Sequence, residues 1–110
     1  MERVEGIGGF FFRAKDPKAL ARWYADHLGV TQTPTSYGQE PWRQDAGPSV
    51  FQPFPADSKY FGRPEQAFML NFRVKSLHAM LAQLRAAGAA VDEKVLEESY
   101  GKFGWVMDPE

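Results

Sequence analysis

The stretch Phe12-Arg13-Ala14-Lys15 returns sixty positions later as Phe72-Arg73-Val74-Lys75. Each copy closes a short apolar run and leads directly into a segment whose apolar residues recur at helical spacing. A repeat of this kind predicts that the chain contains two copies of one structural unit. The second copy ends early, because too few residues follow its helix to repeat the whole first unit.

The first unit is predicted to contain a strand, a helix and three further strands. Residues 7–14 are rich in β-formers, and Asp16-Pro17 supplies an N-cap followed by proline at the first helical position. Gly29 is the expected C-terminal cap of the helix. Shorter apolar and β-branched runs predict strands over 30–35, 42–45 and 49–54.

The second unit repeats this order but lacks a final strand. Residues 68–74 predict a strand, Ser76 is the expected helix N-cap and Gly88 ends the helix. Two strands, 90–95 and 103–107, should flank a turn at 99–102. The side chains with helical spacing in the two helices are expected to form the core, namely Leu20, Trp23, Tyr24, Met80, Leu81 and Leu84.

Composition restricts the class of protein. The chain has 110 residues, which is one domain's worth, and its 44% apolar content is typical of a globular fold. A net charge of −1 argues against nucleic acid or an anionic membrane as partner. The absence of cysteine excludes disulfides and thiol chemistry. With no signal-peptide layout and no long apolar run, the expected location is the cytoplasm.

The segment from Phe12 to Gly29, together with Asp108-Pro109-Glu110, resembles the vicinal oxygen chelate (VOC) superfamily. That superfamily includes glyoxalase I, extradiol dioxygenases and fosfomycin and bleomycin resistance proteins, and the chain looks most like bacterial glyoxalase-like proteins. The resemblance implies an α+β fold in which tandem βαβββ modules form a curved mixed sheet around a cleft, with helices on the convex side. The last strand of the second module is absent.

The resemblance also implies the domain organisation. Residues 1–110 form a single VOC-like domain. Its first module spans about residues 5–56, its connector about 57–66 and its second module about 67–110, which is incomplete at the C-terminal side. Either the sequence stops short of the native C-terminus or a partner chain donates the final strand, and we favour the first explanation.

Enzymes of this superfamily bind a divalent metal through His, Gln or Glu on the opening strand of each module. The matching positions here are Gly9 and Met69, which offer no side chain and a poor thioether ligand. His27 and His78 lie at helix ends, where we expect them on the surface. The sequence therefore predicts no cofactor. The alternative is a metal-dependent glyoxalase- or dioxygenase-type enzyme with non-standard ligands, taken from Glu40, Asp45 or Glu97.

Strand alternation assigns side chains to the predicted cleft. The candidate ligand-binding residues are Phe11, Arg13, Trp42, Phe51, Met69, Asn71, Arg73 and Trp105. Two inward arginines would favour an anionic ligand, and the aromatic rings would suit a flat molecule. The competing interpretation pairs the arginines with carboxylates such as Asp16 or Glu93.

Two functions remain open from the sequence. The first is a small-molecule binder that works without the superfamily's metal, and the second is the metalloenzyme described above. In both cases the resemblance implies a homodimer, because superfamily members are commonly dimers. The sequence contains no Gly-rich phosphate loop and no Ser-His-Asp pattern that would indicate another catalytic class.

Overall fold

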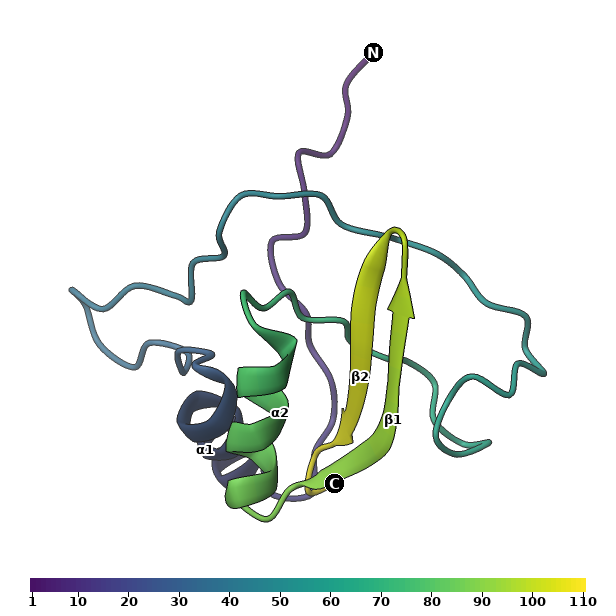
Figure 1. Ribbon diagram of the computed structural model, residues 1–110. Helices are drawn as coiled ribbons and strands as arrows, with labels where there is room; N and C mark the ends of the chain where they lie inside the picture. The colour runs from purple at the N-terminus through teal and green to yellow at the C-terminus, as the bar shows by residue number, and fades with distance from the viewer.

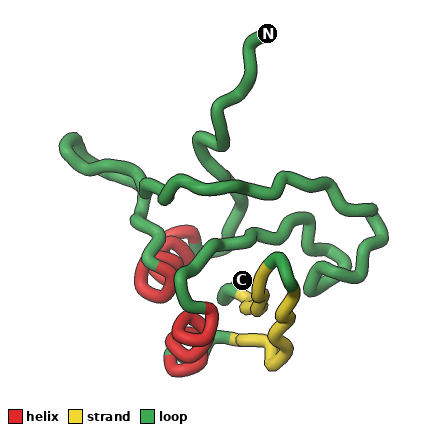
Figure 2. The backbone as a smooth tube through the Cα atoms, turned by 45° about the horizontal axis from the view of Figure 1, so that its top comes forward, coloured by secondary structure: helices red, strands yellow, loops and turns green.

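The computed structural model describes all 110 residues and contains two helices and one hairpin. In chain order these are α1 (Pro17–Leu28), α2 (Leu77–Ala86), β1 (Ala90–Glu98) and β2 (Gly101–Met107). The helices lie near each other on one side of the hairpin (Figure 1). Most of the remaining chain is loop, including the long connection between the helices (Figure 2). The α+β composition agrees with the sequence-based prediction.

Both ends of α1 form as the sequence predicts. Asp16 is the N-cap, and its Oδ1 accepts a hydrogen bond from the backbone N–H of Ala19 at 3.1 Å. Pro17 occupies the first turn, where its missing N–H has no intrahelical acceptor to lose. Gly29 adopts a φ of 73°, a left-handed conformation that glycine tolerates without steric cost.

The second helix follows the same local rules. The hydroxyl of Ser76 accepts a hydrogen bond from the N–H of Ala79 at 3.2 Å, which satisfies one of the free donors of the first turn. After the helix, Gly88 has a φ of 80°, and the following Ala89 N–H bonds back to the carbonyl of Leu84. The predicted cap at Ser76 is therefore confirmed. At the other end Ala87 is the cap, and the predicted Gly88 follows it in a left-handed conformation.

The hairpin is longer and less regular than predicted. β1 and β2 pair antiparallel from Ala90 opposite Met107 to Glu98 opposite Gly101, so only two residues form the turn. The register shifts between Val91 and Val95, which is a bulge in β1.

Gly104 lets α2 approach β2 closely. A Cβ built on Gly104 would lie 3.0 Å from Cδ1 of Leu81 and 3.4 Å from Cδ1 of Leu77. Leu81 and Leu84 of α2, with Leu20 of α1, are the three buried side chains of the structure. The core therefore sits where α2 meets the hairpin, with a small extension at α1.

The predicted strands of the first unit and the opening strand of the second do not form. Residues 7–14, 30–35, 42–45, 49–54 and 68–74 have no strand, and the only sheet is β1 with β2. The tandem βαβββ modules and the curved sheet are thus not seen. A strand requires a neighbour that pairs its N–H and C=O groups. The structure has 30 backbone–backbone hydrogen bonds, whereas a folded chain of this length has about 70.

Side chains nevertheless bring the two predicted opening strands together. The ring of Phe68 lies 5.1 Å from that of Phe10 and 5.7 Å from that of Phe12. The two extended segments are therefore neighbours through their aromatic rings, without backbone pairing between them. Phe11, between the two packed rings, is 92% exposed, so the predicted alternation of sides along this segment holds.

The molecule is more open than a compact domain of its size. Its radius of gyration is 15.6 Å, against about 13 Å for a compact chain of this length. Its accessible surface is 10008 Å², against roughly 6,100 Å² expected from its mass. Large apolar side chains such as Ile7, Val50 and Phe51 contribute to this excess. Extended, apolar and unpaired segments of this kind are surfaces that another chain or strand can cover.

Candidate functional site

Two of the open hollows on the surface are lined partly by the predicted strand segments 7–14, 30–35 and 42–45. The larger, of about 690 Å³, lies beside the C-terminal end of α1 and is mostly polar; its walls come from Ala25, Gly29, Val30, Thr31, Gln32, Thr33, Thr35, Gln39 and Glu40. The smaller, of about 490 Å³, is lined by Ile7, Gly8, Glu40, Pro41, Trp42, Arg43 and Gln44. Of the residues predicted for the ligand cleft, Trp42 alone lines either hollow.

The first-unit candidates lie on an exposed extended segment. The Phe11 ring turns back over Gly9, where an added Cβ would lie only 2.7 Å from Cζ of that ring. Arg13 is exposed and makes no hydrogen bond or ion pair within the protein. The predicted pairing of Arg13 with a carboxylate such as Asp16 is therefore not seen, and its charge is available to an external anion.

Arg73 is engaged differently. Its Nη2 donates a 2.7 Å hydrogen bond to the carbonyl oxygen of Asp45, and its guanidinium lies where a side chain on Gly47 would collide with it. No carboxylate pairs with it. This contact fixes the 45–47 loop against the predicted second opening strand. The neighbouring candidates Met69 and Asn71 are exposed.

The aromatic residues predicted for the cleft lie at separate positions on the surface. Trp42 lies 6.4 Å from Phe72, whose ring is 6.3 Å from Tyr24 of α1. Trp42 therefore lies on the side of segment 68–74 that faces α1. The residues with which it was predicted to share the cleft, such as Asn71, were expected on the opposite side. Phe51 is 87% exposed and has no aromatic neighbour.

Trp105 belongs to a third group on the hairpin. Its ring lies 6.4 Å from Tyr60 of the connector, and Lys94 places its Nζ 5.9 Å from the ring centroid. The bulge in β1 positions this lysine opposite Trp105, since the irregular residues of β1 face that point of β2. The eight predicted residues are thus distributed over several surfaces and do not converge on one cleft.

The histidines lie at the helix ends, as predicted. His78 is exposed in the first turn of α2, whereas His27 packs its ring 5.4 Å from that of Trp23 in the last turn of α1. No group of three His, Asp or Glu side chains gathers in a way that could hold a metal ion. Glu40 instead pairs with Arg43 at 3.6 Å.

The polar group that sequence reasoning missed joins α1 to the end of β2. The Tyr24 hydroxyl donates a 2.6 Å hydrogen bond to Oδ2 of Asp108. Burial raises the pKa of Tyr24, and the Asp108 hydrogen bond and negative charge raise it further, because each disfavours the phenolate. Tyr24 was expected only as a core residue. The available signal was the Asp-Pro-Glu motif itself, but no spacing rule links position 108 to position 24.

Comparison with known families identifies the class. The family model described as a glyoxalase-like domain matches residues 9–110. The chain therefore belongs to the glyoxalase-like domain family, in agreement with the predicted membership of the VOC superfamily. Comparisons with curated proteins and with solved structures give no match. Neither helix is long and apolar enough to span a bilayer.

Proposed function

We propose that this glyoxalase-like domain binds a small anionic or aromatic molecule without the superfamily's metal. The observation that carries the proposal is the pair of residues at the expected metal-ligand positions. Gly9 has no side-chain donor atom, and the space beside it is taken by the Phe11 ring. Met69 offers only a thioether, which is a weak ligand for hard divalent ions.

The anionic character of the ligand is inferred from Arg13. Its guanidinium has no partner within the chain, and a free guanidinium forms strong bidentate hydrogen bonds with carboxylate or phosphate. Arg73 already uses one nitrogen on the Asp45 carbonyl, which leaves its other donors for a ligand. Exposed rings such as those of Phe11 and Phe51 would cover a flat molecule once a partner chain encloses them.

The partner we propose is a second copy of the chain. The accessible surface of one chain exceeds that of a compact chain of this mass by roughly 3,900 Å². Stable homodimers bury about 2,000–5,000 Å² in total, or about 1,000–2,500 Å² per chain, so this excess is large enough for such an interface. A homodimer would also pair the free backbone groups of the extended segments. Sedimentation equilibrium at micromolar concentration should give twice the monomer mass, and a monomer at all concentrations would contradict this part of the proposal.

Ligand binding is tested with a matched pair of probes. Naphthalene-2-sulfonate and neutral naphthalene share a flat ring system and differ in charge, so titration followed by NMR separates the two contributions. We expect the sulfonate to bind more tightly, and Arg13→Gln to weaken it by about tenfold, as for loss of a charge-assisted contact. The control is Arg22→Gln, on the exposed face of α1. Equal binding of both probes to all three proteins would contradict an anion site.

Metal content separates this function from the metalloenzyme. Protein purified without chelators should contain far less than one equivalent of Zn, Ni, Fe or Mn by elemental analysis. A stoichiometric metal, lost in parallel with an activity in Glu40→Gln, Asp45→Asn or Glu97→Gln, would replace the proposal with the metal-dependent enzyme.

A further inference from the structure

Helix α1 is weakly attached to the rest of the fold. The extensive contacts between elements join β1 to β2 and α2 to both strands, and α1 takes part in none of them. Only Leu20 of α1 is buried. One hydrogen bond links the two helices, from the Gln83 side chain to the carbonyl of His27 at 3.0 Å. Core packing of α1 is therefore limited to Leu20, and further contacts are needed to hold the helix beside the hairpin.

The residues after β2 supply this attachment. One oxygen of the Glu110 carboxylate accepts the N–H of Lys15 at 2.6 Å, and the other accepts the N–H of Asp16 at 3.0 Å. These two donors immediately precede α1, where a negative charge is also favoured by the helix dipole. The tyrosine of α1 bonds to Asp108 at 2.6 Å, two turns further along the helix. Residues 108–110 therefore bind α1 at two points, one just before its first residue and one at Tyr24.

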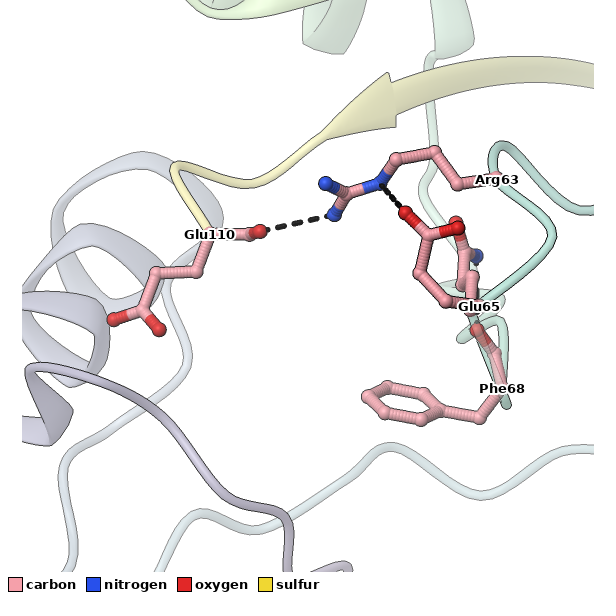
Figure 3. Close-up of polar contacts among 5 residues, drawn as sticks. Arg63, Glu65, Phe68 and Glu110 are labelled. Atoms are coloured by element: carbon pink, nitrogen blue, oxygen red, sulfur yellow. Dashed lines mark hydrogen bonds and ion pairs between the residues drawn. The ribbon is translucent and has the colours of Figure 1, made fainter.

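Residues 108–110 are themselves held in shape. The other oxygen of Asp108 accepts the backbone N–H of Glu110 at 2.9 Å, which closes a turn around Pro109. Arg63 of the connector donates to the carbonyl oxygen of Glu110 at 3.1 Å, while its Nε lies 3.9 Å from the carboxylate of Glu65 (Figure 3). The turn is therefore preorganised, and its two carboxylates present acceptors to α1 without further ordering.

We propose that residues 108–110 act as a releasable latch between α1 and the α2–hairpin body. When the latch is closed, α1 and the preceding extended segment stay beside the body. When it opens, residues 1–29 separate as a unit while α2, β1 and β2 stay folded. The Glu110 contacts are exposed to water, and Leu20 is the only buried side chain that opening would expose. Opening therefore requires less energy than unfolding α2, which buries two leucines against the hairpin. Opening would separate the rings of Phe10 and Phe12 from that of Phe68.

This conformational step rests on the contacts of residues 108–110 and not on the ligand proposed above, although Arg13 of the proposed ligand site lies in the segment that moves. It predicts two groups of amide hydrogens with different opening free energies in one chain. Solvent-exposed hydrogen bonds determine the opening free energy of the first group, which lies in residues 15–28. Packing of α2 on the hairpin governs the second group, in residues 77–107.

Amide hydrogen exchange of the full chain, read by NMR, tests the latch. In Glu110→Ala, the amides of Lys15, Asp16 and α1 should exchange roughly three- to tenfold faster than in the wild type, as expected for the loss of a hydrogen bond. The amides of α2 and the hairpin should be unchanged. Glu98→Ala removes a carboxylate at the end of β1 that makes no hydrogen bond, and it should affect neither group.

A second variant covers the case in which Glu110→Ala does not fold. Tyr24→Phe keeps the ring but loses the hydroxyl that reaches Asp108, and it should accelerate exchange in α1 by a similar factor. Unchanged exchange in α1 would overturn the proposal. Equal acceleration in α1, α2 and the hairpin would overturn it too, because α1 would then open only by global unfolding.

Discussion

Substitution of Gly104 tests how closely α2 packs on the hairpin. An added Cβ would lie 3.0 Å and 3.1 Å from the two Cδ atoms of Leu81, and 3.4 Å from Cδ1 of Leu77. Carbon atoms in ordinary contact are about 3.5–4.0 Å apart, so the leucines would have to give way. Leu81 is 4% exposed and has little room to move.

Two opposing effects set the magnitude. Replacing glycine within a strand stabilises by about 0.5–1 kcal/mol, because the unfolded chain loses conformational freedom. Overpacking a filled site costs about 1–3 kcal/mol. For Gly104→Ala we expect a net loss of about 1 kcal/mol or less. For Gly104→Val, whose two extra methyl groups also press on Leu81, we expect a loss of about 2 kcal/mol.

Urea unfolding followed by circular dichroism measures these losses. Gly8→Ala is the control, because a Cβ at that position would meet nothing within 4 Å. Leu81→Ala alone should cost about 2–5 kcal/mol. In the Gly104→Val background it should cost at least about 1 kcal/mol less, because the valine methyl groups occupy the vacated space. A valine variant as stable as the wild type, or strictly additive losses, would refute the close approach of Leu81 to Gly104.

Three further substitutions probe individual contacts. Burial and a neighbouring carboxylate raise the pKa of Tyr24 in the folded protein. Above pH about 10 the unfolded chain therefore loses the tyrosine proton before the folded chain does, and the free energy of unfolding falls as the pH rises. Tyr24→Phe should make this fall less steep, whereas the control Tyr100→Phe, at an exposed tyrosine, should not. Leu84 is 1% exposed, and Leu84→Ala should lower the unfolding free energy by about 2–5 kcal/mol, far more than Val50→Ala; equal losses would contradict its place in the core. Ser76→Ala should cost about 1 kcal/mol and speed amide exchange in the first turn of α2; unchanged exchange there would exclude the cap.

The local features of the fold were predictable from sequence because each depends on a few adjacent residues. Each helix cap acts within one helical turn, and Asp16, Gly29 and Ser76 cap as predicted. Gly88 adopts the left-handed conformation one residue after the cap, Ala87. The hairpin was predictable for the same reason, since its strands are separated by a two-residue turn. Family membership was predictable from Phe12–Gly29 together with the terminal Asp-Pro-Glu motif, and the family match includes both.

The remaining strands were not predictable on this basis. The segments at 7–14 and 68–74 have the composition of strands, but a strand exists only where another backbone pairs with it. Their rings meet at Phe10, Phe12 and Phe68, while their backbones make no ladder. The predicted cleft required these strands to form one sheet. Because they do not pair, the predicted cleft residues lie on separate surfaces. Arg73 binds a carbonyl, and Trp42 turns toward α1.

The repeat in sequence does not divide the molecule into two self-sufficient halves. An isolated helix of 12 residues is marginal in water, and α1 has only one buried side chain to stabilise it. Its N-terminal donors and its tyrosine are instead satisfied by Glu110 and Asp108, about ninety residues away. The helix of the first unit therefore depends on the last residues of the second. A change in the Asp-Pro-Glu motif, although it lies far from α1 in sequence, should act first on α1 and only later on the hairpin that precedes it.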